Sequence, residues 1–125
     1  MVDIHSHIIN EIDDGSKSID MTINMLKKSE QSGTTDIIAT PHFMRGRFEV
    51  EYKDVVKKVE ELKKIVKENN IDINIYAGQE VYYSRKLIEY YNDKIIGTIN
   101  NTKYMLIELP MLEFNIDEVI NTIYE

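Results

Sequence analysis

The stretch DIIATPH, residues 36–42, decides the fold class of this chain. Its apolar centre, residues 37–39, is typical of a strand that is buried on both faces, as strands of parallel sheets are. Pro41 lacks a backbone N–H and restricts the conformation of the residue before it, so the strand is expected to end there. His42 is therefore expected just past the carboxyl end of a parallel strand.

The alternation of strands and helices continues on both sides of this stretch. Short runs typical of strands occur at residues 2–4, 71–77 and 104–107. Helical spacing of apolar residues occurs at residues 19–26, 55–66, 85–91 and 116–123. This pattern predicts an α/β fold in which parallel strands alternate with helices. Four such strands would leave open sheet edges, so association or poor solubility is expected.

Domain organisation follows from the absence of repeats and of linkers rich in Pro, Gly or Ser. Residues 1–125 are expected to form a single domain, or part of one. Helical spacing continues to Glu125 with no cap after it, so the chain is expected to be cut within a helix.

Composition and charge exclude several classes of protein. The 125 residues, 42% hydrophobic and 30% charged, are typical of one soluble domain. A net charge of -7 makes nucleic acid an unexpected partner. With no cysteine, the chain has no disulfide, thiolate metal site or cysteine nucleophile. No apolar run approaches the roughly 18 residues of a membrane helix, and the first residues lack a signal-peptide pattern. The expected location is the cytoplasm.

Polar side chains that can bind metal follow each predicted strand. His5 and His7 alternate along extended backbone, so both imidazoles can bind one ion from the same side. His42, Glu80 and Glu108 come at the ends of the next three strands. Because the carboxyl ends of parallel strands meet at one edge, these side chains are expected to lie together. Such a set of imidazoles and carboxylates favours Mn, Fe or Zn.

Each of these residues also has a structural interpretation. The first two histidines could be surface residues near the terminus. Glu108 interrupts an apolar run, where an ionised carboxylate is costly unless it is paired or coordinated. A salt bridge to a lysine or arginine would satisfy either Glu80 or Glu108.

Two loops contain further candidates. Residues 13–15, DDG, are an ordinary turn sequence, so Asp13 and Asp14 could be metal ligands or simply turn residues. Arg45 and Arg47, after His42, could form a fork that binds phosphate, or they could lie in a solvated loop.

Motifs of other hydrolase and nucleotide-binding classes are absent from the sequence. There is no Gly-rich loop ending in Gly-Lys-Ser/Thr, no GxGxxG, no GxSxG and no HExxH. Hydrolysis by metal-activated hydroxide remains as the chemistry that the candidate ligands support.

Five blocks of sequence resemble a known family. In order, they are DIHSH (3–7), DDG (13–15), IATPH (38–42), GQEVYY (78–83) and LIE (106–108). They resemble the manganese-dependent tyrosine-protein phosphatases of the polymerase-and-histidinol-phosphatase (PHP) superfamily, the branch associated with capsular and exopolysaccharide biosynthesis. The resemblance implies the N-terminal half of a distorted PHP-type β/α barrel, with metal ions at the carboxyl ends of its strands.

The resemblance also implies roles for individual residues. The implied metal ligands are His5 and His7 for one ion, Glu80 shared with a second, Glu108 for the second, and Asp14 and His42 for a third. Together with Arg47 at the phosphate, Asp14 and His42 are the expected catalytic residues. Manganese is the expected cofactor, with iron or zinc as alternatives.

The function implied by the resemblance is hydrolysis of phosphotyrosine by a metal-activated hydroxide, with no phosphoenzyme intermediate. The lack of cysteine agrees with this mechanism. The implied partner is a tyrosine-phosphorylated autokinase of polysaccharide synthesis. Neither nucleic acid nor a membrane span is expected, and the sequence does not give the oligomeric state.

The sequence departs from the family in length. Family members are about twice as long, comparable with a complete barrel, and their second halves supply a His-Pro-Glu-Arg segment and an Asp-x-His pair that this chain lacks. On its own, the chain is expected to bind metal weakly and to have very low activity. Two alternatives stay open: another PHP phosphoesterase, such as a histidinol phosphatase, and an inactive truncated metal-binding remnant.

Overall fold

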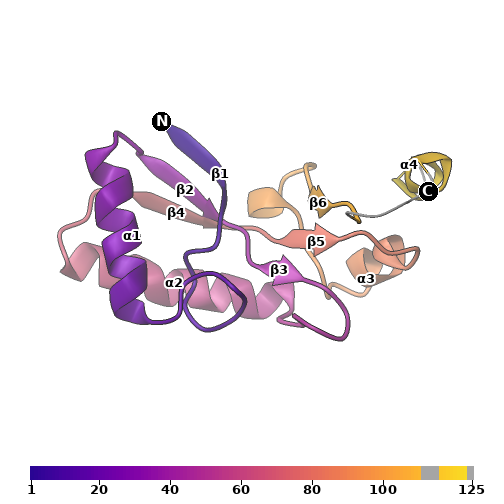
Figure 1. Ribbon diagram of the computed structural model, residues 1–125, viewed down its shortest axis with the longest axis horizontal. Coiled ribbons are helices and arrows are strands. Elements are labelled where there is room, and N and C mark those ends of the chain that lie inside the picture. The colour runs from indigo at the N-terminus through magenta and orange to yellow at the C-terminus, as the bar shows by residue number, and fades with distance from the viewer. Residues whose placement is uncertain (111–115, 124–125) are drawn as a thin grey trace.

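The computed structural model of the chain describes residues 1–110 and 116–123 (Figure 1). In chain order, the elements are β1 (Val2–Ser6), α1 (Ile19–Gln31), β2 (Asp36–Ala39), β3 (His42–Phe43), α2 (Tyr52–Glu68), β4 (Asn74–Ala77), β5 (Glu80–Tyr82), α3 (Leu87–Asn92), the 3₁₀ turn η1 (Ile99–Asn101), β6 (Leu106–Glu108) and α4 (Ile116–Ile123). Each pairing between these strands is parallel. The predicted α/β class, with parallel strands that alternate with helices, is confirmed.

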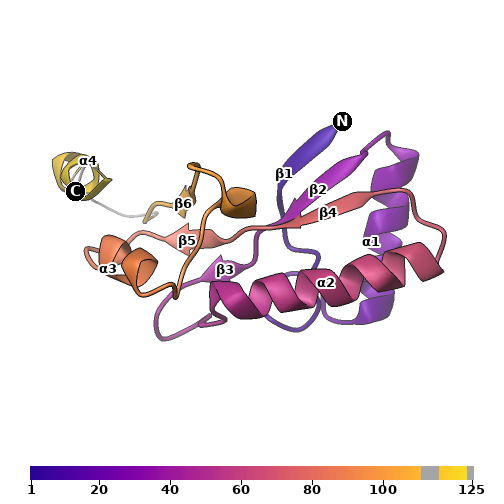
Figure 2. The same ribbon diagram turned by 180° about the vertical axis from the view of Figure 1, so that it is seen from behind.

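The strands form two sheets rather than one. The first has the order β1-β2-β4 and the second the order β3-β5-β6, which lie end to end in Figures 1 and 2. The expectation of one sheet with four strands is therefore wrong. Two residues separate β2 from β3, and two separate β4 from β5. Pro41 lies in the first of these gaps, where it has no N–H to donate to a ladder.

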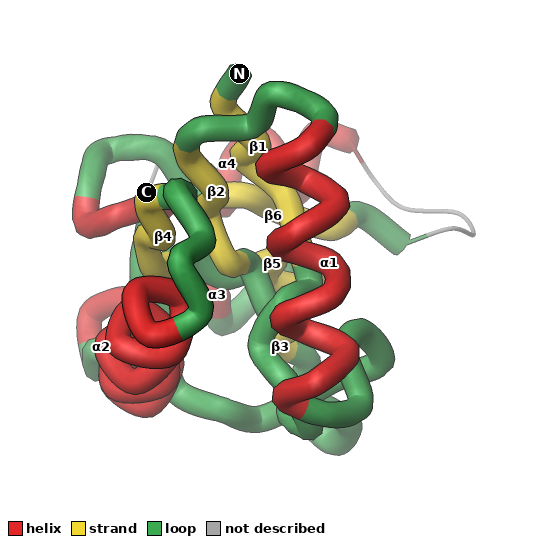
Figure 3. The backbone as a smooth tube through the Cα atoms, turned by 90° about the vertical axis from the view of Figure 1, so that its left-hand side faces the viewer, coloured by secondary structure: helices red, strands yellow, loops and turns green. Residues whose placement is uncertain are grey.

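The first sheet is covered on one side by α1 and α2 (Figure 3). The apolar residues of α2 recur at the predicted helical spacing, and those at positions 55, 59, 62 and 66 are buried. They pack in one cluster with Leu26 of α1, Ile37 of β2 and Ile75 of β4. This cluster is the larger of the two apolar cores that the described residues form.

Both ends of α1 agree with the sequence pattern. Ser18 caps the helix by accepting a hydrogen bond from the Met21 N–H at 3.1 Å. Gly33 follows the C-cap Ser32 with φ +92°, a conformation that favours glycine. The fixed start of α1 determines where the preceding loop, residues 7–18, returns to the helix.

The second sheet has its own small core and is tied to the start of α2. The core consists of Phe43, Val81, Leu87 and Ile96. The fully buried Gln79 donates from Nε2 to the Val50 carbonyl at 3.0 Å and accepts the Gly97 N–H at 2.9 Å. Because Gln79 immediately precedes β5, these bonds fix where Glu80 begins that strand.

The C-terminal part that the structure describes is helical, as predicted. Val119 of α4 is buried, and Arg85 forms an ion pair with Glu118. The expectation that the helix continues to Glu125 falls on residues 124–125, which lie outside the described residues. Within residues 1–110 and 116–123, none of the helices combines the length and the apolar character needed to cross a bilayer.

Candidate metal centre

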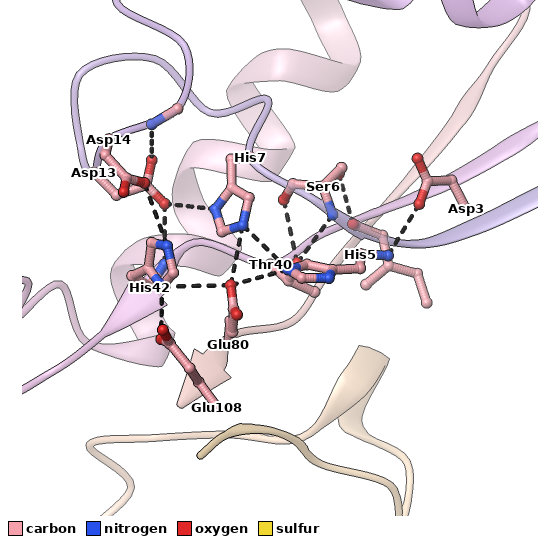
Figure 4. A network of polar contacts seen from close by, with 12 residues as sticks. Asp3, His5, Ser6, His7, Asp13, Asp14, Thr40, His42, Glu80 and Glu108 are labelled. Atoms are coloured by element: carbon pink, nitrogen blue, oxygen red, sulfur yellow. Dashed lines mark hydrogen bonds and ion pairs between the residues drawn. The ribbon is translucent and has the colours of Figure 1, made fainter. Parts of the chain in front are cut away.

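Five of the predicted ligands converge where the two sheets meet (Figure 4). His5 lies on β1, and His7 follows the end of that strand. His42 begins β3, Glu80 begins β5, and Glu108 ends β6. One sheet therefore supplies the first two histidines, and the other sheet supplies the remaining three side chains.

An irregularity in β1 determines how the first two histidines point. The register of β1 against β2 shifts between Asp3 and Ser6, and a bulge of this kind redirects side chains. Ser6 is anchored beyond the bulge, where its N–H donates to Thr40 Oγ1 at 3.0 Å. The Nε2 atoms of His5 and His7 lie 3.1 Å apart. In the structure, the imidazoles of His5 and His7 therefore lie on the same side of the backbone, as predicted.

Glu80 lies at the centre of the cluster. Its Oε2 atom is 2.9 Å from His5 Nε2, 3.0 Å from His7 Nε2 and 3.3 Å from His42 Nδ1. The Glu80 side chain is only 11% exposed. Three imidazole nitrogens from two sheets therefore face one buried carboxylate oxygen.

Glu108 faces the same cluster from β6. Its Oε2 atom lies 3.2 Å from His42 Nδ1, is buried, and accepts no hydrogen bond from any residue that the structure describes. Among those residues, no lysine or arginine lies within 4.0 Å of either Glu80 or Glu108. The alternative in which each glutamate pairs with a basic side chain therefore does not match the described structure. A buried carboxylate oxygen without a hydrogen-bond donor fits a site for a cation.

The two acids of the loop before α1 have different environments. Asp14 is 57% exposed at its side chain, with Oδ1 3.3 Å from His42 Nε2. Asp13 is fully buried, and its Oδ2 lies 2.9 Å from His7 Nδ1. The sequence interpretation chose Asp14 as a ligand and assigned no role to Asp13. The only feature of the sequence that indicated a role for this loop was the adjacent pair of acids, and the pair did not show which of the two side chains points inward.

The contact between His7 and Asp13 affects the ionisation of both. The hydrogen bond to Asp13 raises the pKa of His7 above its ordinary value; burial opposes this, and the charges of nearby acids add to it. Burial opposes ionisation of Asp13. Hydrogen bonds from His7, His42 and Gly15 outweigh burial, so the pKa of Asp13 is lowered. The pair therefore favours an ionised Asp13 beside a readily protonated His7.

Among the residues that the structure describes, three groups of side chains have ligand atoms close enough to share an ion, within 4.8 Å of one another. They are His5, His7 and Glu80; His42, Glu80 and Glu108; and His7, Asp13, Asp14 and His42. All ligand atoms are nitrogen or oxygen, which suits Mn, Fe or Zn. The donor set and the unbonded Glu108 oxygen thus fit a centre with more than one metal ion.

Arg47 lies outside this cluster. It is exposed, and its guanidinium carbon is 5.0 Å from the ring centroid of Phe48, which in turn stacks on His42 at 5.5 Å. The guanidinium of Arg45 lies instead 4.8 Å from the ring centroid of Tyr90. The two arginines rest on different rings, so Arg47 alone has an aromatic link to the cluster. No sequence signal had marked Phe48.

Comparisons with known proteins find a matching family and named relatives. The family described as "Capsular polysaccharide synthesis, CpsB/CapC" matches residues 1–125. CapC of Staphylococcus aureus, by name a candidate tyrosine-protein phosphatase, is 41% identical over 113 residues, which are 90% of this chain and 44% of CapC. The tyrosine-protein phosphatase CpsB of Streptococcus pneumoniae is 36% identical, over 89% of this chain and 46% of CpsB.

A solved structure is also similar to this chain. It comes from a study of YwqE from Bacillus subtilis and CpsB from Streptococcus pneumoniae, described as unique metal-dependent tyrosine phosphatases. The TM-score is 0.88 at 28% sequence identity, and the match covers 97% of this chain and 52% of the other. The chain thus spans about half the length of the relatives that it matches.

Proposed function

The chain belongs to the CpsB/CapC family of capsular polysaccharide synthesis, and from this premise we propose that it is part of a metal-dependent protein-tyrosine phosphatase. The activity is that of the whole protein, of which these residues supply one side of the active site. The observation that carries the proposal is the convergence of His5, His7 and His42 on Glu80 Oε2 in a chain that has no cysteine. A phosphatase without a cysteine nucleophile needs another way to activate its nucleophile.

We assign the predicted ligands to three ions. His5, His7 and Glu80 would hold one; Glu80 and Glu108, with His42 next to them, would hold a second; and Asp14 with His42 would serve a third. Bound divalent cations supply Lewis acidity, which activates water and neutralises charge on a phosphoryl group. Manganese is the proposed metal, since a set of imidazoles and carboxylates accepts it, as it also accepts iron or zinc.

Two side chains at the edge of the cluster, Arg47 and Asp14, would act on the substrate side. Arg47 lies over the ring of Phe48, which stacks on His42, and its guanidinium can bind a phosphate oxygen. Asp14, half-exposed next to His42, is placed to accept a proton at Oδ1.

The proposed substrate is a tyrosine-phosphorylated protein, and specifically an autokinase that controls polysaccharide synthesis. The names of the relatives support a phosphotyrosine protein as the class of substrate. The autokinase is implied by the sequence resemblance, and the cytoplasmic location is inferred from the lack of a membrane-helix run and of a signal-peptide pattern in the sequence. Both stay predictions.

The test compares substrates, metals and variants in one assay. We expect the purified chain to bind Mn²⁺ and to hydrolyse a phosphotyrosine peptide slowly, and we expect a fusion to the part of CapC that the chain does not match to hydrolyse it faster. Hydrolysis by the chain and hydrolysis by the fusion should both vanish when chelator is added and when Glu80→Gln is introduced into either protein. Faster turnover of histidinol phosphate would support the alternative phosphoesterase. Metal binding without turnover, even in the fusion, would support the inactive remnant.

A further inference from the structure

Asp13 has the most deeply buried carboxylate of the site, and each of its polar contacts with the described residues is to a nitrogen atom. Its side chain is 0% exposed. Oδ1 accepts the Gly15 N–H at 2.8 Å, whereas Oδ2 accepts the His42 N–H at 3.0 Å and lies 2.9 Å from His7 Nδ1. A buried carboxylate is costly unless such donors compensate for its lost hydration. Asp13 is therefore satisfied from within the protein, unlike the exposed Asp14.

The contacts of Asp13 determine which nitrogen of His7 has the proton. The two backbone N–H groups can only donate, so they favour Asp13 as an ionised acceptor. His7 Nδ1 must then donate to Asp13, and the lone pair of the neutral ring is on Nε2. That atom lies 3.0 Å from Glu80 Oε2 and 3.1 Å from His5 Nε2. The contact thus turns the lone pair of His7 toward the other ligands.

Asp13 Oδ2 also joins the two sheets at the site. The same oxygen contacts the ring of His7, which follows β1, and the backbone N–H of His42, which begins β3. The two imidazole rings stack with their centroids 4.5 Å apart. Movement of Asp13 would therefore change the positions of ligands from both sheets at once.

The fit of the loop leaves Asp13 little freedom. A Cβ atom at Gly15 would overlap Cβ and the carbonyl oxygen of His7, so this position needs glycine for a close approach. The Ser16 N–H donates to the same His7 carbonyl at 3.0 Å. The loop is thus packed directly on the residue that Asp13 orients.

We propose that Asp13 is a positioning residue, which fixes His7 with its proton on Nδ1 and holds His42 beside it, so that their ring nitrogens face the metal centre. Its link to metal binding rests on the proposed function, whereas its effect on the His7 tautomer does not. Asp14 differs from its neighbour because its own oxygen faces His42 Nε2. The pair of acids thus divides into a positioning residue and a ligand.

The test compares Asp13→Ala, Asp13→Asn and Asp14→Asn with the native chain. Long-range ¹H–¹⁵N NMR spectra of the metal-free proteins, recorded at a pH of about 9 where imidazoles are neutral, give the His7 tautomer. We expect the Nδ1–H tautomer in the native chain and in Asp14→Asn, a mixture of tautomers in Asp13→Ala, and an intermediate result in Asp13→Asn, which keeps one acceptor oxygen. If alanine prevents folding, the asparagine variant still gives the result. An Nε2–H tautomer in the native chain, or an unchanged tautomer in both Asp13 variants, would overturn the proposal.

Calorimetry with Mn²⁺ supplies the second measurement. Loss of a group that orients a histidine ligand typically weakens metal binding about 10- to 100-fold, and this loss is expected for Asp13→Ala. Equal affinity of Asp13→Ala and the native chain would overturn the proposed link to the metal. Absence of Mn²⁺ binding both by the native chain and by its fusion to the part of CapC that it does not match, together with the expected tautomers, would refute the proposed function while leaving the role of Asp13 toward His7 intact.

Discussion

His42 and Glu80 are partners in parallel register at the first positions of β3 and β5, with His42 Nδ1 3.3 Å from Glu80 Oε2. Residues directly beside each other in neighbouring strands point to the same face of the sheet. The pairing of these two strands therefore brings two ligands together that lie far apart in sequence.

Replacement of Glu80 by glutamine should abolish most of the metal affinity. Glu80→Gln removes the negative charge that faces three imidazole nitrogens. We expect a loss of Mn²⁺ affinity beyond the roughly 10- to 100-fold typical of outer-shell changes, measured by calorimetry. Glu60→Gln, on the exposed side of α2, is the matched control and should bind as the native chain does. Similar affinities of the two variants would argue against a metal centre at Glu80.

The stability of the metal-free chain should depend on pH through His7 and Asp13. The raised pKa of His7 contributes stability that is fully present below the ordinary value of 6.5 and is lost as pH rises through the raised value. The lowered pKa of Asp13 contributes stability that is present above 3.8 and is lost as pH falls through the lowered value. Both contributions are thus complete between pH 3.8 and 6.5.

Melting temperatures measured across pH, with chelator present, test this dependence. His7→Gln removes the titrating ring, so the decrease in stability above pH 6.5 should be smaller in this variant than in the native chain. A profile that is the same in both proteins would show that other groups determine the dependence.

Two glycine substitutions separate crowding at the site from backbone strain. Gly15→Ala would force a methyl group against His7, and overpacking of this kind costs about 2–3 kcal/mol of unfolding free energy. Gly46→Ala meets no atom within 4 Å, and only its φ of +86° opposes the change, at a cost of about 1 kcal/mol. Denaturant unfolding measures both.

Metal binding by the two glycine variants provides a further check. Only Gly15→Ala should also weaken Mn²⁺ binding, because it displaces the loop that contacts His7. Native Mn²⁺ affinity in a folded Gly15→Ala protein would mean that the loop can shift without disturbing the ligands.

Arg47→Ala should weaken phosphate binding more than Arg45→Ala does. Both changes remove one positive charge from the same loop, but only Arg47 stacks on the ring next to His42. Arg45 lies over Tyr90 and pairs with Glu49. Loss of an exposed charge-assisted contact of about 1 kcal/mol corresponds to roughly fivefold weaker binding of phosphotyrosine to the Mn²⁺-loaded chain, measured by NMR titration. If the two substitutions weakened phosphotyrosine binding equally, Arg47 would contribute only through the positive charge of the loop and not through a specific contact with the phosphate.

The sequence predicted the larger core well because local periodicity determines it. The helix α2, Tyr52–Glu68, contains the predicted helical segment 55–66, and its four buried positions have the expected spacing. The predicted strand at residues 71–77 is shorter in the structure. Its partner strand begins only at Asp36, which pairs with Asn74, so Ile71 and Ile73 are buried without strand pairing. Apolar patterning reports burial, whereas strand pairing depends on the neighbouring strand.

The division into two sheets and the role of Asp13 were beyond prediction from local patterns. His42 and Glu80 were expected after the ends of strands, yet each begins a strand of the second sheet. The short apolar segments after them are too brief to show a period. Asp13 and Asp14 have identical side chains, and only the path of the loop determines which one is buried.

The two apolar cores differ greatly in size, and this affects how the binding site could come apart. Within the described part of the chain, thirteen buried residues form the first core and four form the second. Segments with few buried contacts open locally at lower free energy than the rest of a protein. A brief local unfolding of the smaller core would displace His42, Glu80 and Glu108 together, whereas His5 and His7 would keep their positions next to the larger core. Ions bridging both halves would then suppress hydrogen exchange at the backbone amides of β3 and β5.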